Sequence, residues 1–79
     1  MPRSSFTRAA DRLRRLLLEA RRRAGMTQAD VAKSLRRPQS FVSDFERGQR
    51  RLDVVEFLEV TRALKADPHD ILRKVDRGE

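Results

Sequence analysis

The sequence predicts an all-α fold, a compact bundle of five short helices. Three observations support this prediction. Apolar side chains recur at three- and four-residue steps along most of the 79 residues. No segment alternates apolar and polar residues for long enough to form a strand. Residues that start and stop helices divide the chain into five segments with short connections, and the length allows one domain.

The first two predicted helices are separated by Gly25. The first is basic and amphipathic and ends at this glycine, which suits the left-handed position after a helix. Thr27 to Asp30 resembles a capping box, with Asp in place of the usual Glu or Gln, so a second helix starts there and stops near residues 34–36. The inward-facing positions of the two helices are Phe6, Ala9, Leu13, Leu16, Leu17, Ala20, Ala24, Val31, Ala32 and Leu35.

Proline and glycine also delimit the other helices. Pro38 suits the first turn of a third helix, where its missing N–H costs nothing, and Gly48 closes that helix. Leu52 begins a fourth helix with Asp53 as its cap, and Asp67-Pro68 opens a fifth. The apolar positions are Val42 and Phe45 in the third helix, Val55, Leu58, Val60 (or Thr61) and Leu64 facing inward in the fourth, and Ile71, Leu72 and Val75 in the fifth.

The ends of the chain are expected to lie outside this domain. We expect residues 1–8 to form a flexible basic arm, residues 9–76 to form the folded domain, and residues 77–79 to be a frayed tail. No apolar run approaches the roughly 18 residues that span a bilayer, and the N-terminus has no apolar stretch of signal-peptide type. The protein is therefore expected to be soluble and cytoplasmic.

The charge of the chain indicates its kind of partner. The sequence has 19 Lys and Arg against 12 Asp and Glu, a net charge of +7. Residues 1–25 carry +6 and residues 26–51 carry +3, whereas residues 52–79 carry −2. A basic surface of this kind indicates a polyanion, most often nucleic acid. The first two thirds of the chain are expected to attract it.

Two short helices near the middle of the chain predict a helix-turn-helix over residues 28–47. Helices joined by only three or four residues cannot pack antiparallel, so they cross steeply. On a helical wheel of residues 38–47, Val42 and Phe45 face the core. Short or bidentate hydrogen-bonding side chains, which suit base edges, lie opposite. These are Gln39, Ser40, Ser43, Asp44 and Arg47. A merely solvated polar face is the plainer alternative, but basic loops bracket this helix on both sides.

The motifs of residues 20–72 resemble a known family. They are Ala20-Arg21…Ala24-Gly-Met-Thr-Gln28, Asp30-Val-Ala32, Pro38-Gln-Ser-Phe-Val-Ser43, Phe45-Glu-Arg-Gly48 and Leu64…Asp67-Pro-His-Asp-Ile-Leu72. Together they resemble the Cro/CI-type helix-turn-helix proteins, or XRE family, over some two thirds of the chain. The resemblance implies a lambda-repressor-like fold and a bacterial or phage-encoded transcriptional regulator, nucleoid-associated when bound to DNA.

The resemblance also implies roles for individual residues. Gln28 contacts phosphate and braces the recognition helix, and Arg21 pairs with Glu46 to tie the first helix to the end of that helix. The base-reading positions are Gln39, Ser40, Ser43 and Asp44. The phosphate-contacting positions are Thr27, Gln28, Arg36, Arg37, Arg47, Arg50 and Arg51.

Two residues depart from the family pattern. Arg36 stands where the turn usually has glycine, and at positive φ it carries strain of roughly 1 kcal/mol. Asp44 is an acid on the reading face, and it repels phosphate unless it accepts a hydrogen bond from a cytosine amino group.

We therefore expect a sequence-specific regulator of double-stranded DNA, a repressor that binds a palindromic operator as a homodimer. The C-terminal third has more apolar residues than two short helices bury, and the dimer surface is expected among Val54, Phe57, Ile71, Leu72 and Val75. The alternative is that these residues complete the monomer's core. Two other functions remain open: an antitoxin or restriction–modification controller, with a toxin or another regulator as partner, and a protein-interaction module that does not bind DNA.

The sequence offers little for other chemistry. The single histidine, His69, has no second metal ligand at useful spacing, so no metal, cofactor or enzyme activity is expected. The absence of cysteine excludes disulfides and a thiol nucleophile. Ser40 and Ser43 have no histidine nearby in sequence. The arginine runs 12–15 and 21–23 could belong to a membrane-surface helix, but their apolar stripe is better explained as core.

Overall fold

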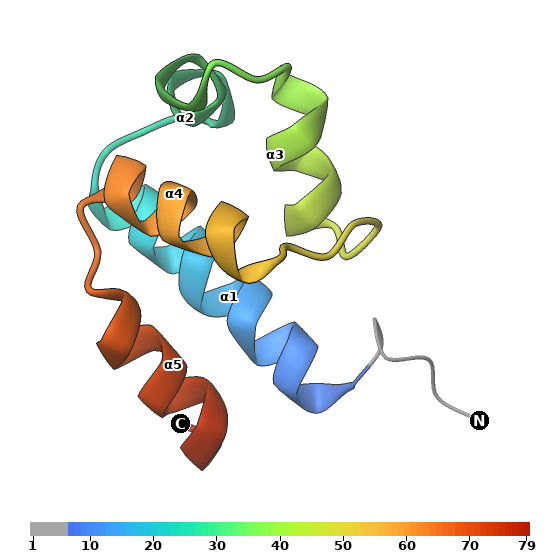
Figure 1. Ribbon diagram of the computed structural model, residues 1–79, viewed down its shortest axis with the longest axis vertical. Helices are drawn as coiled ribbons and strands as arrows, with labels where there is room; N and C mark the ends of the chain where they lie inside the picture. Colours follow the sequence, from blue (N-terminus) through green and yellow to red (C-terminus); the bar gives the residue numbers. More distant parts are fainter. Residues whose placement is uncertain (1–6) are drawn as a thin grey trace.

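The computed structural model describes residues 7–79 and consists there of five helices and no strand (Figure 1). The predicted all-α fold is confirmed. The helices are α1 (Arg8–Arg23), α2 (Gln28–Leu35), α3 (Gln39–Glu46), α4 (Val54–Leu64) and α5 (Pro68–Arg77). Arg8 and Arg77, which were expected in the arm and the tail, are helical. Phe6 and the rest of the predicted arm before Thr7 lie outside the described residues.

Side chains cap the helices where the sequence predicted starts. The Thr27 hydroxyl accepts from the Asp30 N–H, and the Asp30 carboxylate accepts from the Thr27 N–H, which completes the predicted capping box of α2. Asp53 caps α4, so that helix begins at Val54 and not at Leu52. The Asp67 carboxylate accepts from the His69 N–H at the start of α5. These bonds satisfy N–H groups that have no partner within the helix.

Pro38 lies one position earlier in its helix than predicted. It has extended backbone dihedrals, φ −62° and ψ 152°, and is the N-cap of α3. Its fixed φ suits the cap, while its ψ keeps it out of the helical turn. Arg47 is the C-cap, so α3 is shorter than the predicted range 38–47 by one residue at each end.

Two residues with long basic side chains end helices in the left-handed conformation. Arg36 follows α2 with φ 58° and ψ 43°, which confirms the expected positive φ in the turn. Lys65 follows α4 with nearly the same geometry, φ 57° and ψ 36°. This second case was not predicted from the sequence. Both positions strain a residue that has a Cβ.

The helices pack around one apolar core. In Figure 1, α5 runs beside α1 in the opposite direction, and the Arg12 Nη1 donates to the Val75 carbonyl at 2.8 Å across this pair. The buried apolar side chains come from all five helices and are Leu17, Val31, Ala32, Phe41, Val42, Phe45, Phe57, Val60, Leu64 and Ile71. Thr61 is buried too, and its hydroxyl donates to the Leu58 carbonyl at 3.0 Å. This core holds α2 and α3 in place.

The predicted inward face of α4 is partly wrong. Val55 and Leu58, expected inside, have 64% and 39% of their surface exposed. The buried stripe is instead Phe57, Val60, Thr61 and Leu64. These four residues repeat at the three- and four-residue steps that keep side chains on one helix face. Val55 and Leu58 therefore lie on an adjacent face and leave apolar surface uncovered.

Two alanines near the ends of α1 also differ from the prediction. Ala9 and Ala24, which were expected to face inward, are exposed, whereas Leu17 in the middle of the helix is fully buried. The core therefore covers the central turns of α1 more completely than its ends.

Candidate nucleic-acid interface

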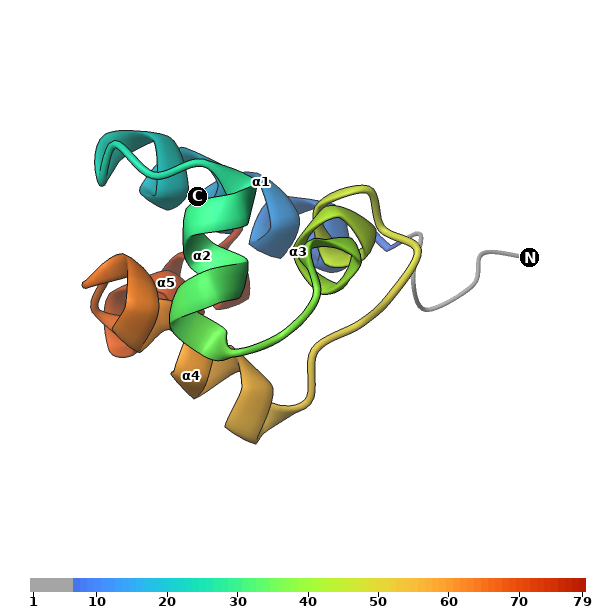
Figure 2. The ribbon, with the colours of Figure 1, turned by 90° about the horizontal axis from the view of Figure 1, so that it is seen from above.

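Helices α2 and α3 form the predicted helix-turn-helix. In Figure 2 α3 is seen nearly end-on while α2 runs across the view, so their axes cross steeply. Residues 36–38 connect them, and the left-handed Arg36 turns the chain out of α2. Val31 and Ala32 of α2 are buried in the common core with Val42 of α3. The two helices are therefore held as one rigid unit.

One side of α3 is buried and the other is free. Phe41, Val42 and Phe45 are buried, and the rings of Phe41 and Phe45 pack edge to face at 5.6 Å. The helical wheel predicted only Val42 and Phe45 on this side, so the burial of Phe41 was not predicted. The polar positions predicted opposite the core are exposed or half-buried, and they are Gln39, Ser40, Ser43, Asp44 and Arg47. This set is named the polar face of α3.

Hydrogen bonds order part of the polar face. The Ser43 hydroxyl donates to the Ser40 carbonyl at 3.3 Å. The Arg47 guanidinium donates to the Asp44 carboxylate at 3.2 Å and to the Gln49 side-chain carbonyl at 3.2 Å. Asp44 thus has an intramolecular cation, which offsets the repulsion that its charge would exert on an approaching anion.

A polar chain ties α1 and α2 to both ends of α3. The Arg21 guanidinium meets the Glu46 carboxylate with two bonds, Nε–Oε2 2.7 Å and Nη2–Oε1 3.1 Å. The Gln28 amide donates to the same carboxylate at 2.8 Å, and the Gln39 amide donates to the Gln28 carbonyl oxygen at 3.5 Å. The structure therefore contains the ion pair that the family resemblance implied, and Gln28 braces α3 as expected.

Arg14 supports the C-terminal end of α3, a contact that was not predicted. Its Nη1 donates to the Glu46 carbonyl at 3.1 Å, and its guanidinium also pairs with Asp11. A Cβ on residue 48 would lie 3.1 Å from the Arg14 Nε and Cζ atoms, so Gly48 leaves room for the guanidinium. A cation at a helix C-terminus is favourable. Only tertiary packing brings Arg14 there, so no local sequence signal indicates it.

The predicted phosphate-binding arginines fall into two groups. Arg36 and Arg51 are exposed and make no ion pair within residues 7–79. Arg37, Arg47 and Arg50 have intramolecular partners. Arg47 pairs with Asp44, whereas Arg37 and Arg50 each lie over the Phe41 ring and pair with Glu56. The Thr27 hydroxyl is engaged in its capping box, and the hydrogen bonds from the Thr27 backbone and side chain lower the pKa of Asp30.

Glu56 is the residue near α3 whose titration is most altered. Hydrogen bonds from Arg50, together with one from the Asp53 N–H, lower its pKa from 4.5 to about 2. The Asp53 bond belongs to a second capping box, at the start of α4. The spacing Asp53-x-x-Glu56 is a sequence signal for this box, although only the Asp53 cap was predicted from it.

The predicted dimer surface needs correction. Phe57 and Ile71, which were expected on the dimer surface, are buried in the core of the monomer. Val75, also expected there, is half-buried against the core. Val54 and Leu72 remain exposed, at 73% and 50%. The exposed large apolar residues of α4 are Val54, Val55 and Leu58. Leu58 lies four positions after Val54 and three after Val55, so its side chain neighbours both on the helix surface. This set is named the α4 patch.

Residues 7–79 show neither a metal site nor a membrane-spanning helix. No group of three or more His, Asp or Glu side chains in this range is placed to hold a metal ion. None of the five helices is long and apolar enough to cross a membrane.

Comparison with known proteins places the chain among helix-turn-helix proteins. The profile of the family described as helix-turn-helix domain matches residues 8–73. An XRE-family-like protein from Pseudomonas syringae pv. tomato is 48% identical, with a TM-score of 0.84 over 87% of this chain and 84% of that one. No curated protein shows a significant match.

Two further solved structures share the architecture. The clp gene regulator ClgR from Corynebacterium glutamicum is 24% identical, with a TM-score of 0.78 over 89% of this chain and 91% of that one, and it supports the fold alone. The restriction–modification controller protein C.AhdI from Aeromonas hydrophila is 29% identical, with a TM-score of 0.72 over 78% of this chain and 94% of that one.

Proposed function

Since the chain belongs to the XRE-like helix-turn-helix family, we propose that it is a transcription regulator that binds double-stranded DNA sequence-specifically with α3 in the major groove. The observation that carries this proposal is the polar face of α3. It is free of the core, holds donors and acceptors, and is flanked by the exposed cations of Arg36 and Arg51. An α-helix fits the major groove, where each base pair presents a distinct pattern of donors and acceptors.

Base reading is assigned to four residues of the polar face. Gln39 is exposed at the first turn of α3, and a glutamine amide can bond to both N6 and N7 of adenine. Ser40 and Ser43 reach either donors or acceptors over a short distance. Asp44 accepts from a cytosine amino group, with Arg47 released toward a phosphate.

Phosphate contacts set the register of α3 in the groove. We assign them to Thr27 and Gln28 at the start of α2, and to Arg36, Arg47 and Arg51 around α3. The bonds from Arg21 and Gln28 to Glu46 fix the orientation of α3 before DNA arrives. Binding therefore loses little entropy in ordering the reading helix.

We further propose that the protein binds a palindromic operator as a homodimer and acts as a repressor. One recognition helix contacts only a few base pairs, and a two-fold axis doubles the site with half-sites about 34–36 Å apart. The α4 patch and Leu72 supply exposed apolar surface in the acidic third of the chain, which does not compete for phosphate. Repression requires only that the bound dimer excludes polymerase from an overlapping promoter.

A restriction–modification controller is a second candidate for the biological role. The observation that favours it is the 29% identity to C.AhdI over 78% of this chain. Both roles use the same DNA-binding face, so they differ in the genes beside the operator. Mapping the bound sites in the native genome separates them, because a controller would occupy sites next to restriction–modification genes.

Selection from a random duplex library tests the proposed function. We expect one enriched motif with two-fold symmetry, and loss of its most constrained base pair when Gln39→Ala is selected in the same way. His69→Ala, which alters an exposed side chain at the start of α5, is the matched control and should select the parent motif. Recovery of unenriched sequences by the parent protein would contradict the proposal and favour a protein-interaction module.

A further inference from the structure

Arg37 and Arg50 flank α3 in the sequence but converge on one aromatic ring. The Arg37 Cζ atom lies 4.4 Å from the centroid of the Phe41 ring, and the Arg50 Cζ atom lies 4.6 Å from it. Phe41 is buried in the first turn of α3. Guanidinium groups at such distances are attracted to the ring electrostatically. The turn before α3 and the loop after it therefore meet over the same residue.

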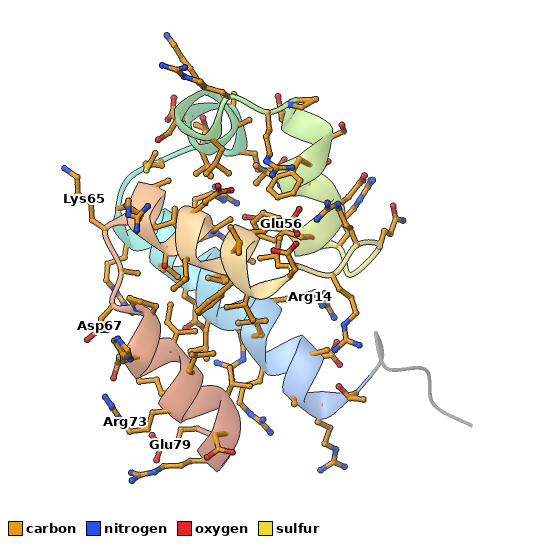
Figure 3. The ribbon with its side chains drawn as sticks, viewed as in Figure 1. Arg14, Glu56, Lys65, Asp67, Arg73 and Glu79 are labelled. Carbon is orange, nitrogen blue, oxygen red and sulfur yellow. The ribbon has the colours of Figure 1, made fainter. Side chains whose placement is uncertain are left out.

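The Glu56 carboxylate pairs with both arginines, and Arg37 also pairs with the Glu59 carboxylate at 3.7 Å. Glu56 accepts from Arg50 with two bonds, Nη1–Oε1 3.0 Å and Nη2–Oε2 2.7 Å, and its Oε2 lies 3.6 Å from the Arg37 Nη1. The Glu56 side chain is 12% exposed, and it also accepts from the Asp53 N–H at 2.9 Å. A bidentate pair of this kind has strict geometry. Solvent screens it in part, because the Arg50 side chain is 38% exposed. Figure 3 labels Glu56 at the start of α4, on the side that faces α3.

These contacts hold α3 at the end opposite to Glu46. The set of Arg37, Phe41, Arg50 and Glu56, here named the arginine clamp, joins the first turn of α3 to the start of α4. Arg21 and Arg14 hold the last turn of α3 through Glu46. The recognition helix is thus held at its first turn by cation–π contacts to Phe41, and at its last turn by charged bonds to Glu46.

The neighbouring arginines differ in their surroundings. Arg51 follows Arg50 directly, and Arg36 directly precedes Arg37. Both Arg36 and Arg51 are exposed and make no ion pair within residues 7–79. A guanidinium already paired with a carboxylate must give up that pair before it can neutralise a phosphate. An unpaired guanidinium gives up only bound water and counterions.

We propose that, of the four arginines in the turn before α3 and the loop after it, Arg37 and Arg50 are positioning residues that hold α3, whereas Arg36 and Arg51 bind phosphate. This revises the prediction that all four contact phosphate. The assignment of Arg36 and Arg51 to phosphate rests on the proposed DNA-binding function. The arginine clamp itself is a property of the free protein.

Arg50→Ala and Arg51→Ala form a matched pair for the test, because they remove the same side chain from adjacent residues. Urea unfolding reports on the clamp, and the slope of log affinity against log salt counts the phosphates that the protein neutralises. We expect Arg50→Ala to lower the urea midpoint and leave the salt slope unchanged. Arg51→Ala should leave the midpoint unchanged and flatten the slope by about 0.9 for each phosphate lost.

Arg50→Lys distinguishes the two roles further. Lysine keeps the charge but loses the planar fork that pairs bidentately and stacks on Phe41. A positioning role predicts a lowered urea midpoint for Arg50→Lys, close to that of Arg50→Ala. The proposal would be overturned if Arg50→Ala flattens the salt slope, Arg50→Lys has the slope of the parent protein, and both variants keep the urea midpoint of the parent.

A failure of the arginine clamp can be distinguished from a failure of the proposed DNA-binding function. If the parent protein binds no duplex, the DNA-binding function fails, and the clamp is still decided by a double-mutant cycle of Arg50→Ala and Glu56→Gln in urea. Non-additive midpoints support the clamp, because the two residues interact only when both are present. Additive midpoints would overturn it.

Discussion

The Arg21 guanidinium on α1 and the Glu46 carboxylate at the last residue of α3 form a two-bond ion pair, with only 14% and 7% of their side chains exposed. They lie 25 positions apart in sequence. Gln28 donates to the same carboxylate, so three helices meet at Glu46. This pair determines how the polar face of α3 is presented.

Removal of the Glu46 carboxylate should destabilise the protein strongly. Glu46→Ala leaves the largely buried Arg21 charge without its partner, and such a loss typically costs about 3 kcal/mol or more. Glu19→Ala is the matched control, because it breaks the exposed Arg15–Glu19 pair, which has 3.5 Å between its charged atoms. That change should cost less than about 1 kcal/mol. Coinciding urea melts of Glu46→Ala and Glu19→Ala would show that the buried ion pair stabilises the protein no more than the exposed one.

Gln39 should determine one base pair in each half-site. Gln39→Ala removes a bidentate donor and acceptor, so we expect a loss of about 1–3 kcal/mol in affinity for the selected duplex and relaxed preference at a single position. Fluorescence anisotropy with duplexes that vary one base pair at a time measures this. An equal loss for every duplex would mean that Gln39 positions the helix without reading a base.

The two strained residues after α2 and α4 should respond alike in stability and differently in DNA binding. Arg36→Gly and Lys65→Gly each relieve positive φ, and each should stabilise the protein by up to about 1 kcal/mol in urea. Arg36→Gly should also flatten the salt slope of DNA binding, because it removes an exposed cation beside α3. Lys65→Gly, at the end of α4, should leave that slope unchanged. Equal slopes for both variants would remove Arg36 from the phosphate-binding set.

Glu56 should make the protein sensitive to acid. Its pKa in the folded state, about 2, lies below the ordinary 4.5, so its stabilising contribution is complete above about pH 5 and is lost as the pH falls from 4.5 toward 2. Glu56→Gln cannot titrate, so its free energy of unfolding should fall less steeply over this range. The lowered pKa values of Asp30 and Asp70 act in both proteins and cancel in the comparison. Parallel curves for the parent and the variant would contradict the assignment.

The α4 patch should form the dimer contact. Val54→Lys introduces a charge at a side chain that is 73% exposed, so it should leave folding intact and raise the dissociation constant of the dimer. Ala9→Lys, at an exposed position on α1, is the control. Sedimentation equilibrium at tens of micromolar gives the molecular mass of each protein. A parent protein that is a monomer under these conditions contradicts the homodimer.

Local signals in the sequence predicted most of the fold. The Thr27 capping box, Asp67-Pro68 and the glycines after helices each act within a few residues, so the order and approximate bounds of the helices follow from them. The inward face of α4 was harder to predict. Apolar residues surround much of that helix, and only its packing against α2 and α1 selects Phe57 over Val55 and Leu58 for the core.

The candidate site could be predicted in part. The polar face of α3 follows from helical periodicity, and the Arg21–Glu46 pair came from the family resemblance. The contacts of Arg14 with Glu46, and of Arg50 with Glu56, depend on how the loop after α3 folds back on α4 and α1. An arginine in a basic loop has the same local sequence whether it points to solvent or to a carboxylate. The sequence therefore could not separate the positioning arginines from the free ones.

Sequence-specific binding to double-stranded DNA is tested most directly by a salt titration with the selected duplex and a scrambled duplex of the same length. Three free or releasable arginines, Arg36, Arg47 and Arg51, in each of two protomers predict a slope of log affinity against log salt of about −5. The selected duplex should bind at least about 1,000-fold more tightly than the scrambled one at physiological salt. Equal affinity for the two duplexes, or no dependence on salt, would contradict the account.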